Sequence, residues 1–328
     1  MTIAHRMFPR LTLRPAVRLV APAVLFALAC TAKEGASGDA KARPTTKTIG
    51  VSLLTREHDF YRQLETGLQD AAAKHGYKLI ITTGDFDLAK QQSAIDNFLV
   101  QHVDAIIVSP TDTKGIAPAI EKANAAGIPV FTADIGAEGG KVVSHIASDN
   151  VAGGRLAGEY IGKVLGGKGD VGIVSQPELQ SVIDRESGFR EAIARFPGIR
   201  IVSTINGAGV RDRALKAADD MFQAHHDLRA VFAINDETAL GVLASASSHS
   251  MKDLVIVGYD AAPEALKAIA AGSALKADVA QQPRAIGTQT IEAIADHFAG
   301  KNPPARIAVP VRIIDADSIR AAGGPPAS

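Results

Sequence analysis

The stretches DAIIV at residues 104–108 and AVFAI at residues 230–234 decide the predicted fold. Each stretch holds a short apolar run. A second apolar run follows each of them and ends in an aspartate 30 positions after the start of the stretch: Asp134 follows Asp104, and Asp260 follows Ala230. Short, continuously apolar runs are typical of strands buried on both faces of a parallel sheet. The same strand pattern therefore occurs twice in this chain, which predicts two similar lobes.

The rest of the chain extends this pattern. Segments whose apolar residues recur at three and four positions separate the runs and indicate helices, as at Phe60–His75, Leu88–Gln101 and Arg211–Ala224. Gly76 and Gly127 stand where helix C-caps are expected. The apolar runs are Ile49–Leu54, Lys78–Thr82, Ala105–Val108, Pro129–Thr132, Val171–Val174, Ile199–Ile205, Ala230–Ala233 and Leu254–Val257. This alternation of strand and helix predicts an α/β fold of two Rossmann-like, doubly wound parallel-sheet lobes.

Polar and aromatic residues gather at the predicted strand ends, and the ligand crevice of open α/β sheets lies outside these ends. An ionised aspartate accepts two hydrogen bonds and can hold adjacent hydroxyls. An arginine donates to ring and hydroxyl oxygens, and aromatic rings cover the apolar faces of a sugar ring. The candidate ligand-binding residues are His58, Phe60, Tyr61, Ser109, Asp134, Arg185, Asn235, Tyr259, Asp260 and Gln281. Such a set predicts a neutral, polyhydroxylated small molecule as the ligand.

Some of these residues have structural alternatives to ligand binding. Asp134 and Asp260 can instead cap the helices that follow them. Phe60 and Tyr61 can be core residues of the next helix, because adjacent helix positions do not face the same way. Arg185 can form a surface ion pair. The equivalent strand-end positions of the two aspartates favour the binding role.

Three further motifs do not support a cofactor or a metal. The segment GKVLGGKG at residues 162–169 ends in glycine and precedes a strand, so it does not fit a phosphate loop. The segment GAGVRD at residues 207–212 lacks the third glycine of a dinucleotide fingerprint. His225 and His226 have no third ligand at metal spacing. Because a G-x-S-x-G nucleophile elbow is missing too, the sequence predicts a protein without cofactor, metal or catalytic activity.

Residues 1–30 have the pattern of an export signal. An apolar run at residues 19–29 follows four arginines and is too short to span a membrane, which takes roughly 20 apolar residues. Cys30 comes directly after Ala27-Leu28-Ala29 and resembles the lipidated cysteine of the bacterial lipobox, although Ala27 replaces the usual leucine. We predict a lipoprotein-type signal peptide, with Cys30 either lipidated or removed with the signal. The four arginines are Arg6, Arg10, Arg14 and Arg18.

The composition limits the partners of the mature chain. Residues 31–46 contain no bulky apolar side chain and are predicted to be a solvated tether. Lys+Arg and Asp+Glu each number 35, so no broad positive field attracts nucleic acid or anionic lipid. Membrane contact is therefore expected only through a lipid anchor at Cys30.

From Thr48 to about Ile314 the chain resembles the periplasmic sugar-binding proteins of ABC transporters, in particular the ribose-binding type. The matching motifs are VSHIASDN at 143–150, AVFAINDE at 230–237, VGYD at 257–260 and AQQP at 280–283. The resemblance implies three segments that cross between the lobes, near Ser148, Gln281 and Pro310. It divides the chain into a signal peptide (1–30), a tether (31–46), an N-terminal lobe (47–148 with 281–309), a C-terminal lobe (149–280 with 310–322) and a tail (323–328).

The resemblance also implies roles for single residues. Phe60 and Tyr61 fall on the ring-stacking positions of the family. The hydrogen-bonding positions fall on Asp134, Arg185, Asn235, Asp260 and Gln281. The departures from the family pattern are His58 and Ser109 in place of asparagines, Ile135 in place of an arginine and Gly209 in place of an aromatic residue. These departures argue against assuming ribose and leave the sugar class standing.

The function implied by the resemblance is capture of a pentose or hexose by an exported monomer. Such a protein lies in the periplasm or on the outer face of the cell membrane and docks on the permease of an ABC-type importer. The alternative is a sugar or autoinducer-type sensor that feeds a chemoreceptor or a histidine kinase. A repressor effector domain of the same fold requires a DNA-reading helix-turn-helix at the start, where this chain has an export signal. Which sugar is bound is left open.

Overall fold

The computed structural model describes residues 46–325. The predicted signal peptide with Cys30, the predicted tether up to residue 45 and the end of the tail lie outside these residues. None of the helices between residues 46 and 325 combines the length and the apolar character that crossing a membrane requires.

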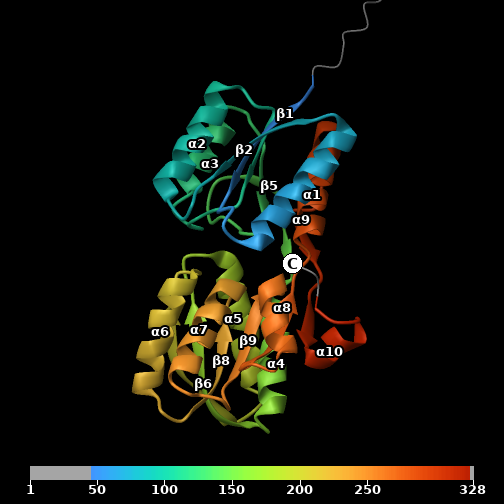
Figure 1. Cartoon of the computed structure of the whole chain (residues 1–328). Coiled ribbons are helices and arrows are strands. Elements are labelled where there is room, and N and C mark those ends of the chain that lie inside the picture. Colours follow the sequence, from blue (N-terminus) through green and yellow to red (C-terminus); the bar gives the residue numbers. More distant parts are fainter. Residues whose placement is uncertain (1–45, 326–328) are drawn as a thin grey trace, which may run out of the picture. The chain divides into compact units, whose positions relative to one another are not determined.

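The first sheet of the described chain has six strands in the order β11-β5-β4-β3-β1-β2, and all its neighbouring strands are parallel. We call this sheet and its helices the N-terminal lobe (Figure 1). Its strands are β1 (Thr48–Leu53), β2 (Lys78–Thr83), β3 (Ala105–Val108), β4 (Val130–Ala133), β5 (Val142–Ser148) and β11 (Arg306–Val309). Its helices are α1 (Asp59–His75), α2 (Leu88–Val100), α3 (Ala117–Ala125) and α9 (Pro283–Phe298).

The second sheet repeats this arrangement in the order β12-β10-β9-β8-β6-β7, and it belongs to the C-terminal lobe. Its one antiparallel pair joins β10 to the edge strand β12. The strands are β6 (Lys168–Ser175), β7 (Gly198–Asn206), β8 (Leu228–Ala233), β9 (Val255–Asp260), β10 (Leu275–Ala280) and β12 (Arg312–Asp315). The helices are α4 (Asn150–Val164), α5 (Gln180–Ile193), α6 (Arg211–Ala224), α7 (Asp236–Ser248), α8 (Pro263–Ala270) and α10 (Ala316–Ala321).

Helices cover both faces of each sheet, so successive strand residues enter different cores. In β3, Ile107 packs in the core that includes α1 and α9, whereas Ile106 packs in the core that includes α2 and α3. In β8, Phe232 and Val231 divide in the same way between two cores. Because side chains alternate across a strand, burial on both faces requires these continuous apolar runs. The predicted fold class, two doubly wound lobes with parallel sheets, is confirmed.

The chain passes between the lobes three times. The passages follow β5 at Asp149, follow β10 at Gln281, and join β11 to β12 through Pro310. Two of the predicted strand-end residues, Asp134 and Asp260, come directly after β4 and at the end of β9. Each sheet therefore carries one of these two aspartates at the carboxyl end of a strand.

Two glycine-containing segments show where a prediction from glycines is confirmed and why a phosphate-loop motif failed. Gly76 is the C-cap of α1 in the left-handed conformation, with φ of 68°. The segment 162–169 contains the end of α4, a turn with positive φ at Gly166 and Gly167, and the start of β6. A phosphate loop instead follows a strand and opens a helix, so this segment has the wrong order of elements.

Candidate ligand-binding site

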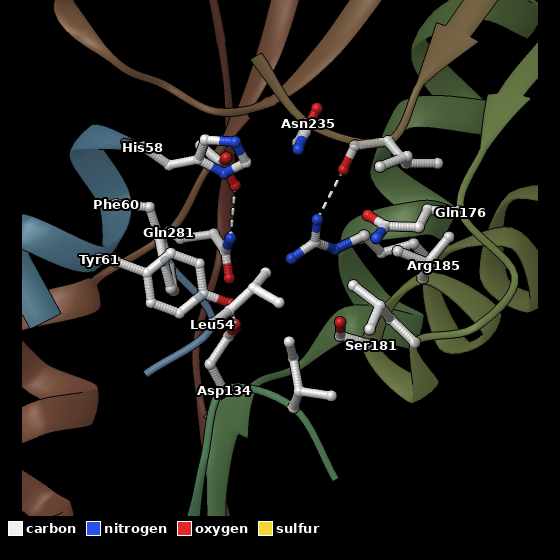
Figure 2. A pocket seen from close by; sticks show the side chains of 15 residues that line it. Leu54, His58, Phe60, Tyr61, Asp134, Gln176, Ser181, Arg185, Asn235 and Gln281 are labelled. Carbon is white, nitrogen blue, oxygen red and sulfur yellow. Dashed lines mark hydrogen bonds between the residues drawn. The ribbon is translucent and has the colours of Figure 1, made fainter. Parts of the chain in front are cut away.

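A cavity lies between residues from the carboxyl ends of both sheets (Figure 2). Its volume is about 30 Å³, counted as space for the centres of water molecules, whereas one water needs roughly 10–15 Å³ by the same measure. The lining residues are Leu54, His58, Phe60, Tyr61, Asp134, Ile135, Gln176, Leu179, Ser181, Val182, Arg185, Ile234, Asn235, Asp260 and Gln281. Eight of the ten predicted site residues are among them.

Asp134 lines this cavity, and its two carboxylate oxygens differ in their hydrogen bonding. Its side chain is 4% exposed, and Oδ2 accepts a hydrogen bond of 2.7 Å from the Tyr61 hydroxyl. Its Oδ1 has no hydrogen-bond partner among residues 46–325. Burial raises the pKa of the Asp134 carboxyl, and the charge of Arg185 opposes this rise. A ligand hydroxyl that donates to Oδ1 would satisfy a buried acceptor, which is otherwise destabilising by about 1–3 kcal/mol.

Asp260 faces the same cavity from the other lobe. Its Oδ1 accepts a hydrogen bond of 2.6 Å from Gln281 Nε2. The Gln281 Oε1 atom is buried and finds no partner in the described part of the chain. Burial raises the pKa of Asp260 to about 7, against the opposing charge of Arg185. Gln281 therefore both orients Asp260 and offers the ligand an acceptor of its own.

The backbone at both aspartates is strained. Asp134 has φ of 69°, Asp260 has φ of 115° and Ala261 has φ of 61°. Residues other than glycine rarely adopt these values, and such strain of about 1–3 kcal/mol per residue clusters at ligand-binding sites. The strand-end turns are therefore held in conformations that aim each carboxylate into the cavity.

A pair of buried carboxyl groups holds the turn behind Asp260. Asp278 Oδ1 accepts a hydrogen bond of 3.0 Å from the Ala261 N–H, and Asp236 Oδ2 accepts one of 2.5 Å from the Ala262 N–H. Burial raises the pKa of Asp278 to about 6 and raises the pKa of Asp236 well above its ordinary value, helped by the nearby charge of Asp278. Two such neighbours share protons as a unit. The pair fixes the backbone that positions Asp260.

Arg185 lines the cavity together with both carboxylates and is 5% exposed. Its Nε donates to Asn150 Oδ1 at 2.8 Å and its Nη1 donates to the Ile234 carbonyl at 2.6 Å. The guanidinium carbon lies 3.8 Å from the centre of the Tyr259 ring, as a cation–π contact requires. These contacts fix the group while its other nitrogen points into the cavity in Figure 2. Its charge opposes the raised pKa of both Asp134 and Asp260.

Of the remaining predicted lining residues, Asn235 holds the backbone of the site in place, whereas His58, Phe60 and Tyr61 place their rings along the cavity. Asn235 is the N-cap of α7: its Oδ1 accepts from the Thr238 N–H at 2.8 Å, and its Nδ2 donates to the Gly209 carbonyl at 3.0 Å. Phe60 meets the Tyr61 ring edge-on at 5.1 Å. Burial lowers the pKa of His58, so a neutral imidazole faces the cavity at neutral pH. Phe60 and Tyr61 both line the cavity although they are adjacent in α1.

Ser109 and Tyr259 lie outside the cavity lining. The Ser109 hydroxyl donates to the Ala133 carbonyl at 2.8 Å, which joins the end of β3 to the end of β4. Tyr259 is fully buried beneath Arg185, and its hydroxyl lies 3.4 Å from Asn150 Oδ1. Both side chains support the site from behind, because each is turned toward neighbouring strands or helices.

Several residues of the cavity lining were not predicted from the sequence. Gln176 follows β6 as Asn235 follows β8, so the strand-end rule that found Asn235 also applies to Gln176. Leu179, Ser181 and Val182 come from the start of α5, and no strand-end signal marks them. Ser181 and Val182 precede Arg185 by four and three positions, which places them on the same helix face.

The buried carboxyls predict an unusual dependence of stability on pH. Asp236, Asp260 and Asp278 each have a pKa above the ordinary 3.8 in the folded protein. The stabilisation from their retained protons is complete below about 3.8 and is lost as pH rises through the folded values. We therefore expect their contribution to the free energy of unfolding to fall between about pH 4 and pH 7.

Urea denaturation at several pH values measures this slope. Asp278→Asn removes one titrating carboxyl, so its curve should be flatter than that of the wild type. Asp96→Asn is the matched control, because Asp96 is an exposed partner of Lys122. Equal slopes for the wild type and Asp278→Asn would show that Asp278 does not titrate in this range.

Two similar lobes with a buried polar cavity between them define a solute-binding protein. The family model for the periplasmic binding protein domain matches residues 49–302. The ribose import binding protein of Bacillus subtilis is 36% identical over 309 residues, which cover 92% of this chain and 99% of that protein. The D-apiose import binding protein of Paraburkholderia graminis is 30% identical over 248 residues, covering 74% and 78%. The chain therefore belongs to the periplasmic binding protein family.

A solved structure supports the same assignment. An ABC transporter solute-binding protein of Mycobacterium smegmatis, crystallised with glycerol, superposes with a TM-score of 0.80. It is 29% identical, and the match covers 84% of this chain and 96% of that chain. The match spans both lobes, so the two-lobed fold is shared along with the family.

Proposed function

We propose that this protein captures one sugar molecule in the cavity between its lobes, outside the cytoplasm, and delivers it to an ABC-type importer. Cys30 would anchor the exported monomer to the membrane through lipid. The step is binding and release, so no residue of the cavity acts as a catalyst. Two relatives, a ribose import binding protein and a D-apiose import binding protein, support this role.

One observation carries the proposal. Asp134 Oδ1 and Gln281 Oε1 are buried acceptors of the cavity for which residues 46–325 provide no donor. Hydroxyl groups are neutral donors that can satisfy such acceptors. Arg185 balances the carboxylates, so the ligand needs no charge. Phe60 and Tyr61 add rings that can cover the C–H face of a sugar.

Closure of the lobes around the sugar couples binding to delivery. Asp134 belongs to one lobe and Asp260 with Arg185 to the other, so a sugar that contacts all three binds the closed form better. A ligand shifts an open–closed equilibrium only through such differential affinity. Moving the ratio of closed to open forms from 1:99 to 99:1 requires the sugar to bind the closed form more favourably by roughly 5.5 kcal/mol. A few charge-assisted hydrogen bonds of about 1.5–3 kcal/mol each can supply this difference.

Thr113 provides a contact between the lobes that lies outside the cavity lining. It follows β3 in the N-terminal lobe, and its Oγ1 accepts a hydrogen bond of 2.9 Å from the Gln180 N–H at the start of α5. Its own N–H donates to the Glu178 carbonyl at 3.1 Å. The N-cap residue of α5, Leu179, supplies no side-chain cap. Thr113 thus caps a helix of the opposite lobe.

We expect Thr113→Val to weaken sugar binding by roughly 2- to 30-fold, because an N-cap contributes about 0.5–2 kcal/mol and this cap forms only when the lobes meet. Isothermal titration calorimetry measures the change. Thr111→Val is the control, since the Thr111 hydroxyl is buried without a partner in the described chain. Equal losses in both variants would argue against a cap between the lobes.

A thermal-shift screen against pentoses, hexoses and polyols tests the proposed function. A ligand at 100 times its Kd stabilises the folded state by about 2.7 kcal/mol, which corresponds to a rise in Tm of roughly 4–5 °C for a domain of this size. We expect at least one sugar to give such a shift and Asp260→Ala to abolish it. The same screen includes the common amino acids, and a rise in Tm with an amino acid but with none of the sugars would overturn the proposal.

A further inference from the structure

Behind Asp260, two buried carboxyl groups each keep one oxygen without a hydrogen-bond donor. Asp236 at the start of α7 is 4% exposed, and Asp278 in β10 is fully buried. In each side chain one oxygen accepts from a backbone N–H of the turn that follows Asp260. The other two oxygens, Asp236 Oδ1 and Asp278 Oδ2, are buried without a partner among residues 46–325. Each carboxyl group is therefore only half satisfied by the protein around it.

The two unpartnered oxygens lie over the same glycine. A methyl group on Gly258 in β9 would lie 2.4 Å from Asp278 Oδ2 and 3.3 Å from Asp236 Oδ1. Two ionised carboxylates placed in this way, buried away from water, would repel each other. One proton removes the repulsion and joins the side chains, because a protonated carboxyl donates a hydrogen bond to an ionised one. The arrangement therefore calls for one proton between Asp236 and Asp278.

The surroundings of the pair supply no other donor. Arg185 is the cation whose charge acts on Asp278, and Asp260 is the further carboxyl whose charge acts on Asp236. The residue opposite Asp278 in β12 is the uncharged Ile314. Asp236 also borders a surface pocket lined by the starts of α1, α7 and α8, whose other titratable residues are Glu57, His58, Asp59, Arg62, Glu237, Asp260, Glu264 and Lys267. Within the described chain, none of these groups donates to Asp236 Oδ1.

Asp236 is the residue that keeps the proton at neutral pH. Burial, together with the charge of Asp278 and a hydrogen bond to it, raises the pKa of Asp236 well above its ordinary value. Burial raises the pKa of Asp278 to about 6, and the hydrogen bond from Asp236 opposes this rise. A contact that needs a proton on a group of raised pKa is complete below that pKa and is lost as pH rises through it. The pair is therefore joined in acidic and neutral solution and separates in alkaline solution.

We propose that Asp236 and Asp278 are positioning residues whose single shared proton controls how tightly the site holds sugar. With the proton in place, the pair holds the turn at residues 261–262, and Asp260 faces the cavity. Loss of the proton leaves two buried negative charges above Gly258, which move apart and release the strained turn. Asp260 then shifts, and sugar binds less tightly as pH rises above neutrality. This inference rests on the proposed sugar-binding function and adds a regulation of the same site.

Asparagine substitutions test the shared proton, because an amide carries a permanent donor where a carboxyl needs a proton. In Asp278→Asn the amide oxygen can still accept from the Ala261 N–H while its NH2 group donates to Asp236 Oδ1. Asp236→Asn keeps the pair joined in the same way from the other side. In the double variant two NH2 groups meet, and turning either amide over sets its NH2 group against a backbone N–H. The double variant therefore has no acceptor between the two side chains.

Calorimetry measures the coupling with the sugar that raises Tm most in the thermal-shift screen. We expect the wild-type affinity to fall by about 10-fold or more between about pH 7 and about pH 9.5, because buried acceptors lose their donor. Each single variant should change by less than about 3-fold over this range, and the double variant should bind at least about 10-fold more weakly than the wild type at about pH 7. Ionisation of Asp260, whose pKa is about 7, cannot mimic the fall, because the ionised carboxylate is the better acceptor for hydroxyls.

Infrared spectroscopy of the sugar-free protein gives a readout that a purely structural role would not move. At about pH 8 the wild type should show the C=O stretch of one protonated carboxyl, since ordinary aspartates and glutamates are ionised there. Both single variants should lack this band, because the remaining carboxyl then ionises against an amide. Asp96→Asn is the matched control, because Asp96 is an exposed partner of Lys122. It should keep both the band and the wild-type dependence of affinity on pH.

The two readouts separate failure of the inference from failure of the proposed function. Equal pH dependence of affinity in the wild type and the single variants, or a wild type without the band, would overturn the inference and leave sugar binding standing. Tight binding by the double variant would overturn it too. If no sugar binds, the coupling fails together with the proposed function, and the band alone then reports whether the pair holds a proton.

Discussion

Arg185→Met should abolish measurable sugar binding and lower the free energy of unfolding by about 3–5 kcal/mol, the usual cost of removing one partner from buried charges. Arg185 is 5% exposed, and its charge opposes the raised pKa of Asp134 and of Asp260. Without it, both carboxyls lie in a cavity that favours their neutral forms. The loss of stability should therefore be largest near pH 8 and shrink toward pH 5, where these groups take up protons.

The same substitution at Arg190 provides the control. Arg190 lies in the same helix, is 45% exposed at its side chain and pairs with Glu186 on the surface. Exposed ion pairs contribute about 0–1 kcal/mol, so Arg190→Met should keep nearly wild-type affinity and stability. Calorimetry and urea denaturation measure the two quantities. Equal effects of the two substitutions would show that Arg185 is not the charge that organises the cavity.

Gly154→Ala should lower the free energy of unfolding by about 3 kcal/mol, at the upper end of what overpacking usually costs. A methyl group on Gly154 in α4 would lie 1.8 Å from the Arg185 carbonyl oxygen in α5. Gly188 makes the reciprocal approach, 1.9 Å from the Val151 carbonyl oxygen. Both obstacles are backbone atoms, so α4 and α5 would have to separate. Because α5 carries Arg185, sugar affinity should fall as well.

Gly136→Ala is the matched control for this substitution. A methyl group there would lie 3.6 Å from its nearest neighbour, an ordinary contact, and Gly136 has no positive φ. We expect a change in the free energy of unfolding within about 0.5 kcal/mol. Urea denaturation compares the two variants. Similar stability of Gly154→Ala and the wild type would mean that α4 and α5 tolerate a wider spacing.

Much of the fold could be predicted because strands buried on both faces must be continuously apolar. The eight predicted runs correspond to β1, β2, β3, β4, β6, β7, β8 and β9. The strands β5, β10, β11 and β12 were not among them. They lie toward one edge of their sheets, and charged or polar residues such as His145, Asp278, Arg306 and Arg312 interrupt their apolar character. Their place depends on pairing with neighbouring strands, which the apolar pattern of a short segment does not encode.

The candidate site was predictable to the extent that strand ends define it. Asp134, Asn235 and Asp260 follow that rule and line the cavity. Ser109 follows it too, but its hydroxyl bonds the neighbouring strand end instead. The helix wall formed by Leu179 and its neighbours could not be found this way, because its place depends on how α5 packs. The pairing of Tyr61 with Asp134 joins residues 73 positions apart and likewise has no local signal.

A structure of the protein crystallised with the sugar that raises Tm most tests the central claim directly. The proposed function predicts electron density for one sugar in the cavity, with hydroxyls within about 3 Å of Asp134 Oδ1 and Gln281 Oε1 and with a Phe60 or Tyr61 ring against its C–H face. Density for the sugar elsewhere on the protein, with ordered water alone between Asp134 and Asp260, would contradict it.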